Sequence, residues 1–332
     1  MKRKYVVNNF SHPLQSPEWA GFRQAWGNEV LETKYGLITL HKIPFLPYKV
    51  GMFIKGPMPT EEMLMDLKKL GERKNLIFIK LEPNYVIKKG NIICAEKQNI
   101  ISLLKKYRAV PGKTLFTPTT FWIDLTPKEE DIFNKFSSKT RYNIRLAQRK
   151  GVTVKEDNSD NAFEKYLQLT RETVKRQGFY AHSEKYHRLL WQHLHQDMLA
   201  QKKFPIAHLL NATYQKEIIT TWIVFVYKNF LYYPYGASSE KFKNVMANNL
   251  MMWEAIRFGK KLKLKTFDLW GREEGKGFTK FKEGHNPQVI EFLGTWDLVI
   301  NKPLYKIYKF AEKLRWVILK GFPKIGIGNP KF

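Results

Sequence analysis

The sequence is poor in cysteine and has no long apolar run. Cys94 is its single cysteine, so a disulfide within the chain and a metal site built from several cysteines are both excluded. No stretch reaches the ~18 uncharged apolar residues that a membrane-spanning helix needs. The basic N-terminus is followed by a short apolar run, 5–10, that contains two Asn and is not the core of a signal peptide. We therefore expect a cytoplasmic protein.

Motifs of several enzyme classes are also missing. The chain has no Gly-x-Ser-x-Gly turn, Walker loop or HExxH helix, which argues against hydrolases and nucleotidases. His187, His193 and His195 fall in one segment, but residues two apart do not share a helical face and no cysteine lies near them. We expect no metal site.

Acidic residues are scarce relative to basic ones. The 30 Asp and Glu residues oppose 57 Lys and Arg residues, which gives a formal net charge of +27. A charge of this size says little about the fold, but it indicates a polyanionic partner: a nucleic acid, an anionic membrane surface or a phosphorylated substrate.

Length and periodicity predict a mixed α/β fold. A chain of 332 residues is longer than one hydrophobic core usually organises, so we expect two domains. The first half predicts strands at 36–40, 48–54, 75–81 and 120–125, and a helix at 61–70 that Thr60 caps. After a helix start at Thr126, the second half predicts helices at 161–176 and 248–261 and strands at 207–214, 217–227, 229–236 and 266–269.

The segment 134–155 is strongly basic and contains no acid. Arg141, Arg145 and Arg149 follow a four-residue step, so a helix would place them on one face, and Lys139 belongs to the same basic segment. A solvated basic helix is the general interpretation. The missing acids and the net charge favour a phosphate-binding surface instead.

The tail, residues 302–332, is the second basic segment. Lys302, Lys306, Lys309 and Lys313 recur at steps of four and three, interleaved with aliphatic and aromatic residues. A basic amphipathic helix of this kind can lie in the interface of an anionic membrane. It can equally dock on the first domain and expose its lysines. Both interpretations remain open.

Two further stretches combine aromatic residues with glycine. In the strand 232–238, alternation predicts that Tyr233 and Tyr235 point to the same side and line one groove. Asp268 closes another strand, and a loop with Gly275 and Gly277 follows it, which is a common place for site residues. These residues alone indicate an anion-binding α/β protein of the transferase type.

Residues 138–145, followed by Lys150-Gly151-Val152, resemble the beginning of the second domain of the Fem-type (FemABX) enzymes. These enzymes are aminoacyl-tRNA-dependent transferases that build peptidoglycan bridges. The resemblance extends over nearly the whole chain through motifs in the family's order: 55–57, 122–125, 175–178, 232–238, 268–271 and 280–282. Each motif is weak, but their shared order and spacing are specific.

The resemblance implies an α/β (α+β) fold of two tandem GNAT-like acyltransferase domains. The first would comprise residues 1–136 plus 295–332, because the C-terminal segment returns to it, and the second residues 137–294. No heptad stretch is present, so we expect a compact form without a coiled-coil arm. The acyl-CoA-binding loop is missing from both halves, which fits aminoacyl-tRNA as the co-substrate and no cofactor.

The resemblance also implies roles for individual residues. Lys282 would stabilise the oxyanion that forms when the acceptor amine attacks the aminoacyl ester, and Phe281 would shape that pocket. The family's phosphate-binding lysine in the first domain has no clear match here, and Arg23 is the best substitute. The remaining residues divide into a set that holds the cell-wall acceptor (Arg176, Tyr180 and Tyr235) and a set that holds tRNA phosphates (Lys139, Arg141, Arg145 and Arg149).

The implied function is transfer of an amino acid from aminoacyl-tRNA to the stem peptide of a peptidoglycan precursor, forming an interpeptide bridge. The precursor would be lipid II or UDP-MurNAc-pentapeptide, and the tail would allow peripheral contact with the inner face of the membrane. Two alternatives stay open: a Fem-like transferase with another acceptor, and an inactive relative that binds RNA or membranes. The sequence does not indicate which amino acid is transferred, how many are added, or the oligomeric state.

Overall fold

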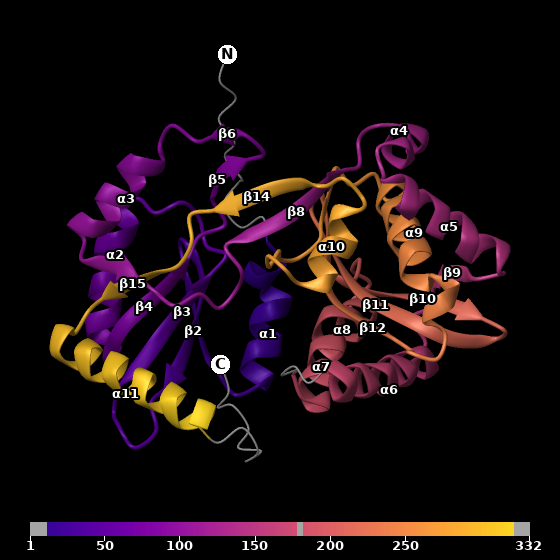
Figure 1. Ribbon diagram of the computed structural model, residues 1–332. Coiled ribbons are helices and arrows are strands. Elements are labelled where there is room, and N and C mark those ends of the chain that lie inside the picture. Colours follow the sequence, from indigo (N-terminus) through magenta and orange to yellow (C-terminus); the bar gives the residue numbers. More distant parts are fainter. Residues whose placement is uncertain (1–11, 178–181, 322–332) are drawn as a thin grey trace.

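The computed structural model describes residues 12–177 and 182–321 and contains two mixed β-sheets (Figure 1). The sheets stand side by side, each with helices on its faces, and helix α1 (Pro17–Ala25) lies between them. A short 3-10 turn, Pro13–Gln15, precedes α1.

The first sheet has six strands in the order β1-β2-β3-β4-β15-β7. Their bounds are β1 Glu29–Thr33, β2 Gly36–Lys42, β3 Lys49–Ile54, β4 Leu76–Glu82, β15 Trp296–Val299 and β7 Ala109–Pro111. The parallel strands β3 and β4 are joined by helix α2 (Glu61–Arg73). This helix begins where the Thr60 hydroxyl accepts a hydrogen bond of 3.2 Å from the backbone N–H of Met63.

Helices cover both faces of the first sheet. On one face, α2 and α3 (Lys97–Lys106) bury a cluster that includes Met63, Leu64, Leu67, Ile100 and Leu104. On the other face, α11 (Lys302–Gly321) packs Leu304, Tyr305 and Tyr308 against Val50, Met52, Ile77 and Phe78. Because β15 and α11 follow the second sheet in the chain, the predicted return of the C-terminal segment to the first sheet is confirmed.

The second sheet has nine strands in the order β6-β5-β14-β8-β13-β12-β11-β10-β9. Their bounds are β6 Ile92–Ile93, β5 Val86–Lys89, β14 Gln288–Phe292, β8 Thr119–Asp124, β13 Thr266–Asp268, β12 Phe230–Ser238, β11 Glu217–Tyr227, β10 Ala207–Tyr214 and β9 Thr153–Glu156. The hairpin of β5 and β6 thus extends this sheet, although it falls in the range predicted for the first domain. The predicted domain limits stay a prediction.

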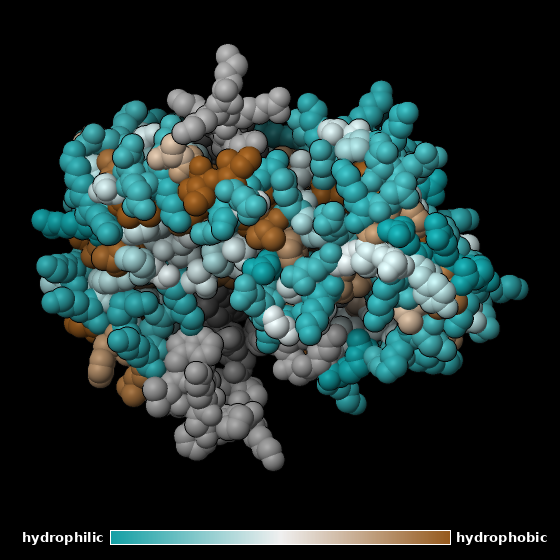
Figure 2. All heavy atoms as spheres, turned by 45° about the horizontal axis from the view of Figure 1, so that its top comes forward, coloured by the Kyte–Doolittle hydropathy of each residue, from teal (hydrophilic) through white to brown (hydrophobic). Residues whose placement is uncertain are grey.

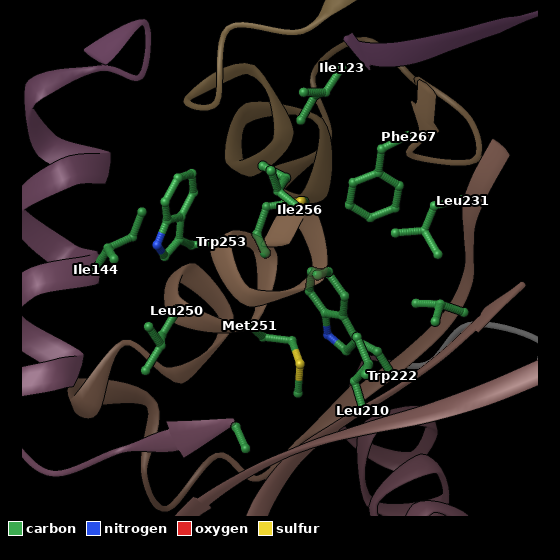
Figure 3. Close-up of a cluster of buried hydrophobic side chains, with 14 of the residues drawn as sticks. Ile123, Ile144, Leu210, Trp222, Leu231, Leu250, Met251, Trp253, Ile256 and Phe267 are labelled. Carbon is green, nitrogen blue, oxygen red and sulfur yellow. The ribbon is translucent and has the colours of Figure 1, made fainter. Parts of the chain in front are cut away.

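One face of the second sheet carries α4 (Glu129–Asn134), α5 (Ser138–Arg149) and α9 (Ala247–Lys261). Figure 3 shows the core beneath them, where Trp253 of α9 lies beside Ile144 of α5 and Met251 of α9 lies beside Trp222 of β11. The opposite face carries α6 (Asp160–Gln177) and α7 (Glu184–Trp191), which continues through a π-helical turn, Gln192–Gln196, into α8 (Asp197–Ala200). A short 3-10 turn, Lys243–Val245, precedes α9, and α10 (Gly277–Glu283) follows β13.

The predicted helices and strands are confirmed, with their ends shifted by a few residues. The elements that were not predicted are the helices α1, α3, α7, α8 and α10 and the strands β1, β5, β6, β7, β9, β14 and β15. The tail does form a helix that docks on the first sheet.

Figure 2 shows that the visible surface is largely hydrophilic, with hydrophobic residues in small patches. Within the described ranges, no helix is both long and apolar enough to cross a bilayer.

Candidate active site

A cavity of about 240 Å³ lies between the two halves of the molecule. α1 contributes Trp19, Ala20 and Arg23, and the first sheet contributes side chains of β2 and β3 such as Thr39 and Met52. The second half closes it with His182 and with Tyr186 of α7. The cavity therefore exists only because α1 brings the two sheets together.

Arg23 is the cation of this cavity. It stands in the last turn of α1, a helix that begins where the Ser16 hydroxyl accepts a 3.1 Å hydrogen bond from the N–H of Trp19. The side chain is only 7% exposed and hydrogen-bonds the Tyr186 hydroxyl. Burial lowers the pKa of the guanidinium, and no carboxylate among the described residues forms an ion pair with it. A buried cation without a carboxylate is a strong site for an anionic ligand.

Aromatic side chains surround Arg23. The hydroxyl groups of Tyr186 and Tyr235 lie 3.4 Å apart, and the ring of His182 stacks on Tyr186 with a centroid distance of 3.8 Å. Burial and the charge of Arg23 lower the pKa values of both His41 and His182 to about 4. Both imidazoles are therefore neutral at pH 7, and Arg23 supplies the positive charge of the cavity.

The structure corrects one prediction about the strand β12. Tyr233 and Tyr235 do not share a side, because a β-bulge interrupts the pairing: Tyr235 pairs with Ile223 and Tyr232 with Phe225. The extra residue turns Tyr233 into the core on the other face, where its ring stacks on Trp222 at 3.7 Å. Of these two tyrosines, only Tyr235 faces the Arg23 side of the sheet.

A buried carboxylate organises the second part of the site. Asp268, at the end of β13, accepts hydrogen bonds from the Thr120 hydroxyl (2.6 Å), the Trp122 indole (2.9 Å) and the backbone N–H of Trp270 (2.8 Å). These contacts fix the position of the chain directly after β13. The parallel pairing of β12 with β13 ends here, at Tyr232 and Asp268. β12 therefore continues beyond the end of β13, and Tyr235 lies in this continuation.

Lys282 reaches the same chain segment from α10. Its side chain is buried, and its Nζ donates hydrogen bonds to the carbonyl of Gly271 (2.9 Å) and, more weakly, to that of Trp270 (3.4 Å). An ammonium group has three N–H donors, of which these hydrogen bonds use two, and the centre of the Phe278 ring lies 4.9 Å from the same Nζ. Burial lowers the pKa of Lys282 to about 8, against the opposing effect of the Asp268 and Glu273 carboxylates.

Trp270 connects Lys282 to the Arg23 cavity. Its carbonyl accepts from Lys282, and its ring contacts Phe116, at 6.0 Å between centroids, and His12, at 5.4 Å. Phe116 in turn lines the Arg23 cavity. Phe281, in contrast, packs its ring toward His285 and the core cluster on the α5 side of the sheet.

The basic residues of α5 begin next to α10. The backbone N–H of Ser137, the N-cap of α5, donates to the Gly284 carbonyl at 2.9 Å, two residues after Lys282. Lys139, Arg145 and Arg149 are exposed, and none of them pairs with an acid in the described part of the chain. Arg141 is different, because its guanidinium donates to the carbonyls of Asn134 and Phe136 and so fastens the end of α4.

The remaining acceptor-site predictions have different outcomes. Arg176 lies at the end of α6, where it donates to the Ser238 carbonyl at 3.2 Å and pairs with Glu240 at 3.4 Å. It thus ties α6 to the end of β12, three residues beyond Tyr235. Tyr180 lies outside the described residues.

The histidines considered as metal ligands serve in packing. His187 contacts the Tyr166 hydroxyl at 3.0 Å, His195 the Ala207 carbonyl at 2.7 Å, and His193 the Asp197 carboxylate at 3.1 Å. Among residues 12–177 and 182–321, no group of three His, Cys, Asp or Glu side chains is arranged to hold a metal ion.

Sequence reasoning missed Tyr186, His182 and His41 as neighbours of Arg23. His182 and Tyr186 lie at the start of α7, whereas His41 comes from β2, and none of the three belongs to a motif. The signal that could have found them is indirect: Ser183 caps α7 by accepting from the N–H of Tyr186 at 3.3 Å, and this places Tyr186 in its first turn.

Solved structures with this fold support the predicted class. The chain superimposes on the crystal structure of FemX with a TM-score of 0.75 at 17% identity, covering 90% of this chain and 95% of that one. The C-terminal domain (DUF2156) of a putative lysylphosphatidylglycerol synthetase from Agrobacterium fabrum is more distant, with a TM-score of 0.57 at 10% identity and coverage of 90% and 92%. The fold is therefore that of FemX, and the predicted α/β class is confirmed.

A family model described as "FemAB family" matches residues 3–222 and 192–313, so the chain belongs to the FemAB family. It is 22% identical to "Lipid II:glycine glycyltransferase" of Staphylococcus haemolyticus, covering 87% of this chain and 86% of the relative. The same named enzyme of Staphylococcus aureus is 20% identical, with coverage of 87% and 86%. The enzyme class is that of the aminoacyltransferases.

Proposed function

We propose that the protein transfers an amino acid from aminoacyl-tRNA to the stem peptide of a peptidoglycan precursor. Membership in the FemAB family and the similarity to enzymes named lipid II:glycine glycyltransferases support a role in building peptidoglycan bridges. The donor, the acceptor and the amino acid are parts of this proposal. It places the enzyme in the cytoplasm, at the inner face of the membrane when the acceptor is lipid-linked.

The observation that carries the proposal is the buried, carboxylate-free Arg23 in a cavity between the two halves of the molecule. A peptidoglycan precursor carries a diphosphate and the carboxylates of its stem peptide, and either kind of group fits a planar guanidinium with several donors. The neighbouring hydroxyl groups of Tyr186 and Tyr235 add hydrogen-bonding groups on the same side. This cavity is the proposed acceptor site.

The aminoacyl-tRNA donor would bind at α5, on the side of Lys282 that is away from the Arg23 cavity. Lys139, Arg145 and Arg149 of α5 offer cations to tRNA phosphates, and α5 starts beside the helix that carries Lys282. The terminal aminoacyl ester would then lie between Lys282 and the acceptor cavity, at the point where β12 and β13 separate. Phe281 would support Lys282 from the core.

The reaction follows from this arrangement. The acceptor amine attacks the ester carbonyl, and the third N–H of the Lys282 ammonium group stabilises the oxyanion of the tetrahedral intermediate. When the intermediate collapses, the amide forms, the bond to the ribose oxygen breaks, and the proton lost by the amine balances the one gained by the ribose hydroxyl. The ester is already activated, so positioning and charge stabilisation suffice without a covalent enzyme intermediate.

The test is a transfer assay. The protein is incubated with charged tRNA and either lipid II or the soluble UDP-linked precursor, and mass spectrometry detects the mass of the added amino acid. A panel of tRNAs charged with different amino acids identifies the donor, and successive additions count the residues transferred. If no charged tRNA supports transfer to either precursor, the proposal is wrong.

A further inference from the structure

The outer side of α11 and the turn between β2 and β3 expose large apolar side chains. Ile307, Phe310 and Leu314 recur at helical spacing and are 64%, 70% and 52% exposed. Phe45 and Leu46, at the tip of the turn 43–48, are 104% and 52% exposed. The side of α11 that faces the sheet is formed by other residues, Leu304, Tyr305 and Tyr308.

The turn and α11 belong to one packed unit. The backbone N–H of Ile43 donates to the Tyr48 carbonyl at 3.1 Å, and that of Leu46 donates to the Ile43 carbonyl at 3.2 Å, so the turn is closed. Ile43 and Tyr48 pack in the same cluster as the inner side of α11. In Figure 1 the turn projects just below this helix. The turn and α11 are therefore neighbours on the same face of the first sheet.

Lysines border this apolar surface. Lys302, Lys306 and Lys313 are exposed and form a row along α11 beside Ile307, Phe310 and Leu314. Lys42 is exposed directly before the turn. Between residues 302 and 311 there is no acid, and Glu312 is paired with Lys309 at 2.6 Å. An apolar strip with cations at its border fits a surface that is apolar inside and negatively charged outside.

We propose that this surface docks the enzyme on an anionic phospholipid membrane. Phe45 and Leu46 insert between the lipids together with Ile307, Phe310 and Leu314, while the lysines bind the headgroups. The inference builds on the proposed function, because it explains how a lipid-linked acceptor reaches the Arg23 cavity. Met52 and Ile54 support this geometry, since they line the cavity and also pack in the cluster that α11 covers.

A second copy of the chain is a less suitable occupant. A two-fold contact through this surface would bring the lysine rows of both copies together, and like charges destabilise such a contact. A membrane supplies the opposite charge. The proposal therefore commits to the lipid surface, and self-association is one outcome of the test.

The experiment measures binding to phosphatidylcholine vesicles with and without phosphatidylglycerol by co-sedimentation of the full chain, without substrates. The wild type should bind the anionic vesicles, and binding should weaken as salt is added. Phe45→Ser combined with Leu46→Ser, and separately Ile307→Ser combined with Phe310→Ser, should each weaken binding about ten-fold or more. The matched control is Leu199→Ser, which removes a 54% exposed leucine from α8 and should change nothing.

Circular dichroism should show that all four proteins are folded alike. Transfer to the soluble precursor should be unchanged in the serine variants, whereas transfer to lipid II in vesicles should fall with vesicle binding. If the serine variants bind vesicles like the wild type, membrane insertion is wrong even if transfer occurs. A dimer in analytical ultracentrifugation that Phe310→Ser dissociates would also overturn the inference, in favour of self-association. Loss of all transfer with intact vesicle binding would instead contradict the proposed function alone.

Discussion

Arg23 and Lys282 are both buried cations, but their surroundings differ. The carboxylates of Asp268 and Glu273 act on Lys282, and two backbone carbonyls hold its ammonium in place. Among the described residues, Arg23 has no carboxylate partner, and its neighbours are tyrosine hydroxyl groups and uncharged side chains of the cavity. This difference suits a fixed donor in the first case and a binding site for an incoming anion in the second.

Replacement of Arg23 by alanine should raise the KM for the acceptor by about 10- to 100-fold, because a charge-assisted contact to a buried anion is lost. Arg23→Lys keeps the charge without the planar fork and should give an intermediate KM. Stability in urea should change by less than about 1 kcal/mol, since no partner carboxylate is left behind. Unchanged acceptor KM together with a large loss of stability would assign Arg23 a structural role.

Lys282→Ala should lower turnover by ~100-fold or more, because the oxyanion contact is lost together with the hydrogen bonds to the Gly271 and Trp270 carbonyls. Binding of tRNA should stay intact, since the proposed phosphate contacts lie on α5. The contribution of Lys282 needs the protonated amine. Since burial lowers its pKa to about 8, that contribution is complete well below pH 8 and is lost as the pH rises through it.

The acceptor amine has the opposite dependence, because it attacks only when deprotonated. The pH profile is therefore compared with that of Lys282→Arg, whose guanidinium stays protonated throughout. The ratio of wild-type to Lys282→Arg turnover should be constant below pH 8 and fall above it. A constant ratio across the whole range would contradict the assignment of Lys282 as the donor.

At the scale of elements, one face of α5 packs in the core and the opposite face carries exposed arginines. Thr140, Ile144 and Ala147 are buried against the core, so the helix would form in any case from its own amphipathic pattern. Arg141 fastens α4, whereas Arg145 lies over the half-buried ring of Phe133 and Arg149 over the exposed ring of Tyr142, and neither pairs with an acid in the described part of the chain. The outward arginines are therefore available to a polyanion.

Arg145→Ala combined with Arg149→Ala should weaken tRNA binding, and the slope of log affinity against log salt should fall by about 1.5, the loss of two phosphate contacts. Filter binding at several salt concentrations measures this slope. The control is Arg257→Ala, which removes an exposed arginine of α9 that is already paired with Glu129 and Glu254. An equal effect of both changes would show a general charge effect and no specific surface.

The strand β12 shows where periodicity fails. Alternation placed Tyr233 and Tyr235 on one side, and this is wrong because the bulge inserts an extra residue between the pairs of Tyr232 and Tyr235. A bulge depends on how β11 and β12 pair, which a single strand does not encode. The bulge turns Tyr233 away and leaves Tyr235 on the Arg23 side.

At the scale of the whole molecule, a buried ion pair fastens the C-terminal segment. Lys80 of β4 and Asp297 of β15 lie 2.6 Å apart and are both buried, although 217 residues separate them in the chain. The Tyr305 hydroxyl of α11 donates to the same carboxylate at 2.9 Å. Asp297 therefore holds both β15 and α11 on the first sheet.

Asp297→Ala should lower the free energy of unfolding by about 3–5 kcal/mol, because it leaves the Lys80 ammonium buried and unpaired. Replacing both residues, as Lys80→Met with Asp297→Leu, should cost clearly less, since no charge remains to be buried. Urea unfolding of the two variants checks this. If the double variant were as unstable as Asp297→Ala, side-chain volume and not charge would be the cause.

The sequence by itself determined the α/β class, most helices and strands, and the family, because these depend on local periodicity and on motifs in a fixed order. It also singled out Lys282 and the arginines of α5, since these lie in recognisable stretches, whereas Arg23 entered as the substitute for a family lysine that has no clear match.

Only the tertiary structure decided that Arg23 is buried without a carboxylate, that Tyr186 and Tyr235 stand beside it, and that Phe281 points to the core. It also decided that α11 docks on the first sheet and keeps an apolar side exposed. Burial and partner choice arise between segments far apart in the chain, and the spacing of residues along one segment carries no information about them.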